Sequence, residues 1–428
     1  MRVLMFGWEF PPHISGGLGT ACFGLTKALA GFSDIEVTMV VPRLWGGEDK
    51  THIRLLGADQ VQVVQKELHF DDPESKIDYY ELHSGLIPYL GTSEFYELSS
   101  KLESAEKRLV ETTPEGKIVF GGDYGQNLFQ EIQSYAIVAE KLARLLDFEV
   151  IHVHDWMTFP AGIAAKRVSG KPLVVHIHST EFDRSGNQIN PAIYNAEKEG
   201  MDRADQIIAV SNFTRNIIIR NYYIEPEKVQ TVYNAVEPFD IKTKSASGTI
   251  QKEKIVLFLG RITSQKGPGY LIDAAELVLQ KLKNVRFIMA GKGDLRDKMI
   301  NRVAELNISD RFEFPGFIED TDVANLLGSA DVFVMPSVSE PFGIVALEAM
   351  HAMTPVIISR QSGASEVLQN VIKVDYWNVQ QMADAILQVL TDPELKNNLS
   401  KEAKKEAKNL PWKKPASDIR KIYRHLNK

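Results

Sequence analysis

The chain has 428 residues, of which 44% are hydrophobic and 25% charged, and its formal net charge is −7. This composition is typical of a globular protein, and the length predicts two domains rather than one. The acidic balance argues against a nucleic-acid-binding protein, which usually carries a strongly basic surface, so we expect no nucleic-acid partner. The single cysteine, Cys22, excludes an internal disulfide framework and indicates a reducing compartment.

The sequence shows no recognisable targeting or membrane segment. The first residues, MRVLMFGWEF, form a short apolar run without a small-residue cleavage site. No uncharged apolar run approaches the roughly 20 residues that a membrane-spanning helix needs. We therefore expect a soluble, cytoplasmic protein.

The first half of the chain predicts alternating strands and helices, interrupted by a long variable stretch from Gly57 to about Gln133. The expected strands are residues 2–8, 36–42, 149–155, 172–179, 206–211 and 229–236. The expected helices are residues 20–32, 135–146, 160–168, 194–204 and 212–222. A polar segment without periodicity, residues 237–254, follows and is typical of a linker.

From Lys254 onward the alternation becomes regular. The expected strands are residues 254–260, 285–291, 311–316, 331–337, 355–359 and 371–374. The expected helices are residues 267–282, 294–306, 322–330, 338–353 and 379–390, with a last helix over 411–428. Short, non-alternating apolar strands between amphipathic helices indicate a parallel sheet covered on both faces. The sequence thus predicts two doubly wound α/β domains that face each other across a cleft, with ligands beyond the carboxyl ends of the strands.

A glycine-rich turn follows the first expected strand and opens a helix. Gly16, Gly17 and Gly19 allow close approach of the backbone, and a helix amino terminus favours an anion. The turn lacks the G-x-G-x-x-G pattern, so a nicotinamide-type site is not supported. The alternative is a flexible surface loop.

Two cations stand at the end of the strand 254–260. Arg261 and Lys266 suit a diphosphate, the first as a fork and the second as a point charge. A pair of solvated surface charges is the alternative.

Four histidines stand at the ends of two other strands. Strand alternation puts His152 and His154 on one face, and His176 and His178 likewise, with Asp155 after the first pair. These residues could ligate zinc, or they could be satisfied imidazoles that line a crevice. The sequence offers no further Cys or His cluster to complete a metal shell, so we expect no metal.

The segment 338–353 predicts a buried helix with one carboxylate, Glu348, inside it and another, Glu340, before it. A buried carboxylate needs donors because its removal from water is costly. The donors could be hydroxyls of a bound sugar and ribose, or a core arginine. The amides of Phe342 and Gly343 would then point into the cleft.

Together these segments resemble the retaining nucleotide-sugar glycosyltransferases of the GT-B superfamily. The run from Glu340 to Glu348 is similar to their E-x7-E motif, and GRITSQKG to their phosphate-binding Arg and Lys. SGGLGT is similar to their amino-terminal glycine loop, and HVHDW and HIHST to their acceptor-side segments. The resemblance covers nearly the whole chain apart from residues 57–133. It is nearest to glycosyltransferase family 4, and the segments HVHDW, EPFGIVALEAM and SGGLG together resemble those of glycogen and starch synthases.

The resemblance implies a domain plan with two Rossmann-like halves. Residues 1–236 would form the acceptor-side domain, and residues 237–410 the domain that binds the nucleotide sugar. The last helix, residues 411–428, would cross back onto the first domain.

The resemblance also implies roles for individual residues. The catalytic set it implies is His178 beside the anomeric carbon, Arg261 and Lys266 on the leaving diphosphate, Glu340 on the sugar hydroxyls and Asp155 near the acceptor. The donor-binding set it implies is Gly16, Gly17, Arg261, Lys266, Phe317, Ile318, Phe342, Gly343, Ile344 and Glu348. Within that set Glu348 would meet the ribose, and Phe317 and Ile318 would hold the base. On the acceptor side it implies Asp155 and Asn234.

The implied reaction transfers glucose from UDP-glucose or ADP-glucose to the non-reducing end of an α-1,4-glucan, without a metal or other cofactor. The bacterial starch-synthase type carries a lysine before the double glycine, where this chain has Ile14 and Ser15. That departure favours UDP-glucose over ADP-glucose. The aromatic-rich segment 77–98 could stack on acceptor sugars or belong to the core.

Another acceptor remains open within the same family: a cell-envelope glycan, a lipid or a small molecule. The last helix supports it, because a basic amphipathic helix can meet anionic lipid. Its basic residues are Lys413, Lys414, Arg420, Lys421, Arg424 and Lys428. The commoner alternative is a solvated helix packed by its apolar side. The sequence does not predict the oligomeric state.

Overall fold

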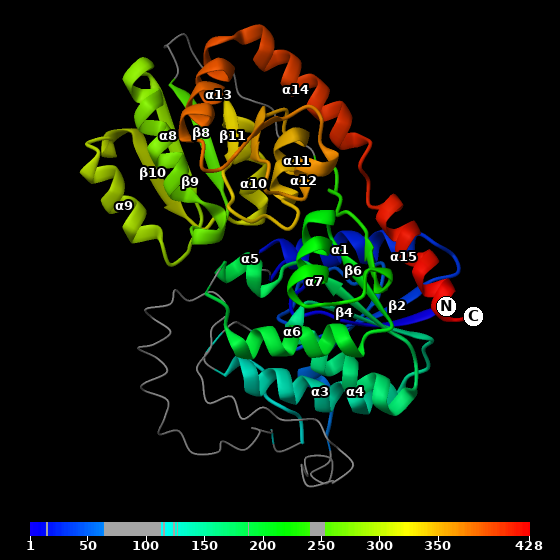
Figure 1. The fold of residues 1–428 in the computed structure, drawn as a ribbon. Coiled ribbons are helices and arrows are strands. Elements are labelled where there is room, and N and C mark those ends of the chain that lie inside the picture. Colours follow the sequence, from blue (N-terminus) through cyan, green and yellow to red (C-terminus); the bar gives the residue numbers. More distant parts are fainter. Residues whose placement is uncertain are drawn as a thin grey trace, which may run out of the picture.

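The computed structural model describes residues 1–13, 16–63, 113, 116–122, 125, 127–186, 188–239 and 253–428. These residues form two α/β units, each built on one parallel sheet (Figure 1). The prediction of two doubly wound parallel sheets is therefore confirmed. Ile14, Ser15 and the aromatic segment 77–98 lie outside the described residues.

The amino-terminal sheet has seven strands in the order β3-β2-β1-β4-β5-β6-β7. These strands are β1 (Arg2–Phe6), β2 (Glu36–Val41), β3 (Arg54–Gly57), β4 (Val150–His154), β5 (Leu173–Ile177), β6 (Gln206–Ala209) and β7 (Val229–Thr231). Its helices are α1 (Gly17–Ala30), α3 (Leu128–Leu145), α4 (Phe159–Ser169), α5 (Glu181–Ser185), α6 (Pro191–Arg203) and α7 (Asn212–Asn221). Strands β4 and β5 are buried at every residue, and β1 at every residue except Arg2, as expected of a parallel sheet that helices cover on both faces.

The carboxy-terminal sheet has six strands in the order β10-β9-β8-β11-β12-β13. These strands are β8 (Lys254–Leu259), β9 (Val285–Ala290), β10 (Phe312–Gly316), β11 (Val332–Met335), β12 (Val356–Ser359) and β13 (Ile372–Val374). Its helices are α8 (Pro268–Lys281), α9 (Arg296–Glu305), α10 (Asp320–Ser329), α11 (Ile344–His351), α12 (Ala364–Val367), α13 (Val379–Thr391) and α14 (Pro393–Lys408).

The last helix, α15 (Lys413–Leu426), leaves the carboxy-terminal unit and packs on α1 of the amino-terminal unit, close to both termini (Figure 1). Gly24 permits this contact, because a Cβ there would lie 2.2 Å from Nε1 of Trp412. Arg420 and Arg424 each contact the carboxylate of Asp34 at 2.6 Å and 2.7 Å. These ion pairs lower the pKa of Asp34 to about 2.

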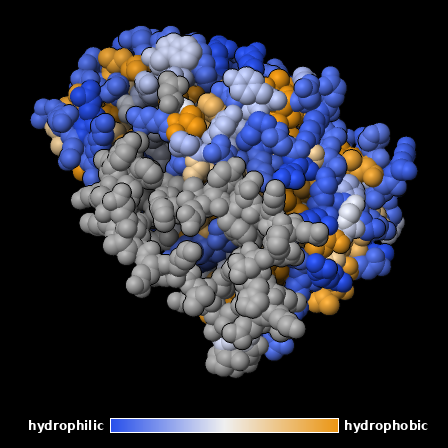
Figure 2. All heavy atoms as spheres, turned by 60° about the horizontal axis from the view of Figure 1, so that its bottom comes forward, coloured by the Kyte–Doolittle hydropathy of each residue, from blue (hydrophilic) through white to orange (hydrophobic). Residues whose placement is uncertain are grey.

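One buried apolar cluster joins the two units, since it includes Val3 and Leu25 of the first and Phe342 and Leu347 of the second. None of the helices among the described residues is both long and apolar enough to cross a membrane. On the face shown in Figure 2, the described surface is mainly hydrophilic, and its hydrophobic residues are scattered in small groups.

Candidate active site

Both sheets reverse their strand order once, and several of the predicted site residues follow the strands at these two reversals. In the amino-terminal sheet the reversal lies between β1, which leads to the glycine turn, and β4, which leads to Asp155. In the carboxy-terminal sheet it lies between β8, which leads to Arg261, and β11, which leads to Glu340. Ligands of open α/β sheets bind at such points because the flanking loops diverge there.

Lys266 and Glu340 form the central contact of the carboxy-terminal half of the site. The Nζ of Lys266 lies 2.6 Å from Oε2 of Glu340, and the hydroxyl of Ser337 donates to the same oxygen at 2.9 Å. The side chain of Glu340 is 7% exposed and that of Lys266 is 19% exposed. A nearly buried carboxylate is thus satisfied by a cation and a hydroxyl, as its desolvation requires.

Two glycines allow the loops of this contact to approach each other. Gly267 has a φ of 63°, and a Cβ there would lie 2.3 Å from the carbonyl oxygen of Pro336. Gly343 has a φ of 100° and precedes α11 without a side chain to cap it. Both positions need glycine, because other residues rarely adopt a left-handed backbone.

The segment before α11 differs from the predicted helix. Helix α11 begins at Ile344, after the left-handed Gly343, so Glu340 lies before the helix as the sequence predicted, while the first residues of the stretch 338–353 form a loop. In this loop Glu340 is buried, while Glu348 within the helix is half-buried. The expected burial of the two carboxylates is therefore reversed.

Arg261 is half-buried and lies beside the same loop. One of its terminal nitrogens donates to the side-chain oxygen of Gln265 at 3.3 Å. The backbone carbonyl of Gln265 accepts from the N–H of Val338 at 2.9 Å. The arginine loop and the Glu340 loop are thus tied together through Gln265, a residue that the sequence did not single out.

On the amino-terminal side, Asp155 organises the backbone around His178. Asp155 has a φ of 58°, and its Oδ1 accepts from the backbone N–H of His178 at 2.6 Å and of Ser179 at 3.3 Å. Burial raises the pKa of Asp155 to about 7, while these two hydrogen bonds lower it. A carboxyl group that titrates near neutral pH is typical of an active site.

The four predicted histidines form a two-by-two array. His152 stacks on His154 with ring centroids 4.5 Å apart, and His176 stacks on His178 at 4.3 Å. Across the strands, Nε2 of His152 lies 3.3 Å from Nδ1 of His176, and Nδ1 of His154 lies 3.0 Å from Nε2 of His178. Burial lowers the pKa of His152 and of His178 to about 3 and lowers those of His154 and His176 well below the usual range. The four rings are therefore neutral at pH 7.

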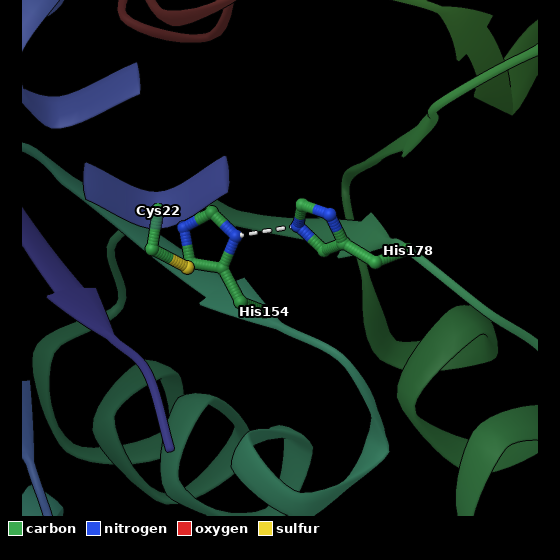
Figure 3. Close-up of side chains that lie close together, drawn as sticks. All are labelled: Cys22, His154 and His178. Atoms are coloured by element: carbon green, nitrogen blue, oxygen red, sulfur yellow. Dashed lines mark hydrogen bonds between the residues drawn. The ribbon is translucent and has the colours of Figure 1, made fainter. Parts of the chain in front are cut away.

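Two residues outside the predicted site contact this array. The hydroxyl of Tyr423 in α15 hydrogen-bonds to Nδ1 of His152. Cys22 of α1 lies beside the ring of His154, on the side away from His178 (Figure 3). Burial raises the pKa of the Cys22 thiol well above its usual value. No sequence signal indicated Tyr423, and from the sequence Cys22 only excluded an internal disulfide framework.

The array gives two groups of three ligand atoms that lie within 4.8 Å of one another: Cys22, His154 and His178, and His152, His154 and His176. Zinc needs ligand lone pairs that converge on one point in a tetrahedron. The rings are instead stacked on or tilted against one another, with interplanar angles from 19° to 37°, and their nitrogens pair across the strands. This orientation suits a hydrogen-bonded imidazole stack better than a metal centre, and a metal-free site stays a prediction.

The remaining predicted residues lie around these contacts. Gly16 and Gly17 are exposed at the start of α1, with open space where a Cβ would stand. Phe317 is 45% exposed, with Nζ of Lys292 5.8 Å from its ring centroid, and Ile318 is half-buried. Asn234 is 9% exposed. Phe342 and Ile344 are buried on either side of Gly343.

A direct hydrogen bond joins the two halves of the site. The hydroxyl of Ser339, next to Glu340, donates to Oδ1 of Asp183 at 2.6 Å. Asp183 caps α5 in a reciprocal pair with Thr180, two residues after His178. The loop of the carboxylate and the loop of the histidine are thus in contact across the domain boundary.

Two facing parallel-sheet α/β domains, with polar residues gathered at both topological switch points, define the GT-B fold of nucleotide-sugar transferases. Residues 101–238 match the family described as Glycosyltransferase Family 4, and residues 240–406 match Glycosyl transferases group 1. The chain is therefore a glycosyltransferase of the GT-B type, and the two family regions follow each other along it.

Similar proteins cover the chain over its whole length. An uncharacterized glycosyltransferase of Methanocaldococcus jannaschii is 29% identical over 99% of this chain and 98% of its own length. A glycogen synthase of Mycobacterium tuberculosis is 24% identical over 99% of this chain and 94% of its own. The solved sucrose-phosphate synthase of Thermosynechococcus elongatus has the same fold, with a TM-score of 0.69, 19% identity, and coverage of 99% of this chain and 98% of its own.

Proposed function

We propose that this glycosyltransferase moves a glucosyl unit from a nucleotide-glucose to the non-reducing end of an α-1,4-glucan, with retention of anomeric configuration. The observation that carries the proposal is the Lys266–Glu340 contact at the switch point of the carboxy-terminal sheet, bridged to the histidine loop by Ser339 and Asp183. A cation and a carboxylate side by side suit the two parts of a nucleotide sugar, its diphosphate and its hydroxyl-rich sugar. The full-length match to a protein named glycogen synthase supports the glucan as acceptor.

In this reaction the main demand is to stabilise the negative charge that grows on the leaving diphosphate. Lys266 and Arg261 meet that charge from fixed positions, which need no reorganisation as the bond breaks. The exposed amides at Gly16 and Gly17 add the amino terminus of α1 from the other domain. The carboxylate of Glu340 accepts hydrogen bonds from the hydroxyls of the transferred sugar. Its contact with Lys266 holds both side chains in place.

The proposed donor site continues along the carboxy-terminal domain. Glu348 meets the ribose, Phe317 and Ile318 hold the base, and the backbone at Phe342 to Ile344 faces the sugar. UDP-glucose is the favoured nucleotide because Ile14 and Ser15 replace the lysine of the ADP-glucose-dependent pattern.

The amino-terminal side receives the acceptor. A neutral His178 lies beside the anomeric carbon, and Asp155 and Asn234 face the incoming hydroxyl. The leaving phosphate assists its deprotonation, and Lys266 and Arg261 supply the positive charge for which other transferases use a metal. Closure of the two domains excludes water that would otherwise hydrolyse the donor. The single, buried thiol fits a cytoplasmic enzyme.

A second candidate is a transferase with a cell-envelope glycan, lipid or small-molecule acceptor, favoured by the basic helix α15. Two of its cations, Arg420 and Arg424, are already paired with Asp34. Two others, Lys414 and Lys421, pair within the helix with Asp418. Less of its positive charge is therefore free for lipid than the sequence alone suggests, and the glucan remains the first proposal.

Release of nucleotide tests the two candidates together. We expect slow release of UDP from UDP-glucose by the protein alone and a strong increase on addition of glycogen. Sedimentation with anionic vesicles at low salt should leave the protein in the supernatant. Stimulation by a lipid-linked sugar but not by glycogen, together with vesicle binding, would favour the second candidate.

A further inference from the structure

Glu366, in the short helix α12 that follows the loop packed against Glu340, caps a helix of the other domain. Its two carboxylate oxygens accept from the backbone N–H groups of Asn212 at 2.9 Å and of Phe213 at 2.6 Å. These are the first two residues of α7, in the amino-terminal domain. The third N–H of that turn, from Thr214, is satisfied by Ser211 within the same domain. Of these three N–H groups at the amino terminus of α7, two are therefore capped by the other domain and one by its own domain.

A third donor completes this contact. The hydroxyl of Tyr233, just beyond β7, donates to Oε2 of Glu366 at 2.9 Å and accepts from the side-chain amide of Asn212 at 2.7 Å. All three donors to the carboxylate come from the amino-terminal domain. A carboxylate at a helix amino terminus is favoured both by charge-assisted hydrogen bonds and by the helix dipole. The contact therefore depends on the charge of Glu366 and on how the two domains are placed.

The segment just before Glu366 is joined to the loop of Glu340 by three backbone hydrogen bonds. The backbone N–H of Gly363 donates to the carbonyl of Glu340 at 2.9 Å, and the N–H of Ala364 to that of Phe342 at 2.8 Å. In return, the N–H of Glu340 donates to the carbonyl of Gln361 at 3.0 Å. A displacement of Glu366 should therefore also displace Glu340, the carboxylate that contacts Lys266.

The packing at this point leaves no room for a side chain at residue 363. A Cβ on Gly363 would lie 2.1 Å from the carbonyl oxygen of Pro341 and 2.5 Å from Cβ of Ser211, the residue before α7. The backbone of the carboxy-terminal domain at Gly363 therefore lies close to the side chain of Ser211 in the amino-terminal domain, beside Glu366. On the other side of Glu340, the Ser339–Asp183 hydrogen bond provides a second contact between the domains.

We propose that Glu366 is a positioning residue, which clamps the carboxy-terminal domain onto α7 and thereby sets Glu340 and Lys266 opposite His178. The clamp itself follows from the contacts, while its effect on sugar transfer rests on the proposed function. If the domains open, the carboxylate of Glu366 loses all three of its hydrogen-bond donors. The first two N–H groups of α7 lose their acceptor at the same time. The charge of Glu366 therefore biases the free protein toward the arrangement in which the two halves of the site meet.

Small-angle scattering of the free protein tests the clamp without any substrate. Glu366→Gln keeps the size of the side chain but removes its charge, and we expect a larger radius of gyration than for the wild type. Tyr233→Phe removes one donor and keeps the ring, and it should shift the radius in the same direction by less. The matched control is Glu406→Gln, because Glu406 caps the N–H groups of Gln369 and Asn370 within one domain. This control should leave the radius unchanged.

Kinetics of the same variants test the positioning role. We expect Glu366→Gln to lower kcat about ten- to a hundredfold, since one or two charge-assisted hydrogen bonds are lost from the closed arrangement. The share of donor lost to hydrolysis should rise, and the KM for the nucleotide sugar should change less than kcat. If Glu366 had a purely structural role, Glu366→Gln and Glu406→Gln would both lower Tm, and neither would change kcat more than KM.

An unchanged radius and an unchanged kcat in Glu366→Gln would overturn the proposal. A larger radius of gyration with a wild-type kcat would overturn the positioning role. Glu366 would then hold the domains together without affecting sugar transfer. Should the wild-type protein show no transfer from nucleotide-glucose, the proposed function fails, and the scattering comparison of the three variants still decides whether Glu366 holds the domains together.

Discussion

The ammonium group of Lys266 lies 2.6 Å from a carboxylate oxygen of Glu340, although the two residues are 74 positions apart in the chain. The contact links the loop after β8 to the loop after β11, the two strands that flank the switch point of the carboxy-terminal sheet. Glycines at 267 and 343 permit this approach, and Ser337 completes the hydrogen bonding of the carboxylate. This pair is therefore the structural centre of the proposed donor site.

Alanine at Lys266 or at Arg261 should lower kcat by about two to three orders of magnitude, because each removes fixed positive charge from the leaving diphosphate. Steady-state release of nucleotide measures the effect. Lys281→Ala is the matched control, since Lys281 of α8 forms an exposed ion pair with Asp384 away from the switch point. The assignment would be contradicted by near-normal turnover in both site variants.

Breaking the buried ion pair should also cost stability. We expect Glu340→Gln to lower the free energy of unfolding by about 3 kcal/mol, because it leaves the partly buried Lys266 without its counter-charge. The double variant K266M/E340L should recover much of that loss, since it removes both charges together, yet stay inactive. Urea unfolding and nucleotide release measure the two properties separately. Equal instability of the single and double variants would show that packing, not charge, explains the loss.

The histidine array predicts that stability depends on pH. The folded-state pKa values of the four histidines are lowered, to about 3 for His152 and His178, so the unfolded chain binds more protons below about pH 6.5. The free energy of unfolding should therefore fall as pH drops below that value, by up to about 1.4 kcal/mol per pH unit for each histidine. Urea unfolding at several pH values measures this slope.

The variants His152→Phe and Tyr423→Phe separate the array from other titrating groups. The first removes one histidine and should reduce the slope, whereas the second removes only the hydroxyl that contacts His152 and should keep it. The explanation would be wrong if both variants kept the wild-type slope.

Attachment of α15 should weaken in acid. The pKa of Asp34 is lowered to about 2 by Arg420 and Arg424, so its stabilising contribution is present above about pH 4 and is lost as pH falls through about 2. At neutral pH, Asp34→Asn should remove that contribution and speed hydrogen exchange in α15. Asp418→Asn, which breaks pairs only within α15, is the control. Equal exchange in α15 of the wild type and Asp34→Asn would refute the anchoring role.

Treatment with chelators should leave transfer unchanged. The four imidazoles pair with one another through their ring nitrogens, and the proposed stabilisation of the diphosphate uses Lys266, Arg261 and helix α1. Activity after dialysis against EDTA, with and without added Mg²⁺ or Zn²⁺, is the measurement. A loss that only added metal reverses would contradict the prediction.

The regular elements of the fold could be predicted because their residues repeat with the period of the element. Helix α8 runs from Pro268 to Lys281, close to the predicted 267–282, and its apolar positions recur at helical spacing. Helix α14 (Pro393–Lys408) was not predicted, because its buried face consists of small residues such as Ala403 and Ala407. Asp392, which caps it, and Pro393 at its first position were the signals that could have located it.

Of the site, the sequence could predict which residues follow the strands of one sheet, but not which residues of the other domain contact them. The position of Lys266 and Glu340 after strands of a parallel sheet indicated that they share an edge, and they are in contact. The partners contributed by the other domain were not predictable. Asp183, Glu366 and Tyr423 sit at ordinary positions in their own elements, and their contacts arise from how the domains and α15 pack.

The most direct test of the account is to incubate the purified protein with UDP-glucose and a short maltooligosaccharide and to resolve the products by mass. The account predicts a ladder of glucans longer by one or more glucose units, with one UDP released for each unit added. Release of UDP with free glucose as the sole sugar product, or no product from any glucose nucleotide while other sugar nucleotides or acceptors react, would contradict it.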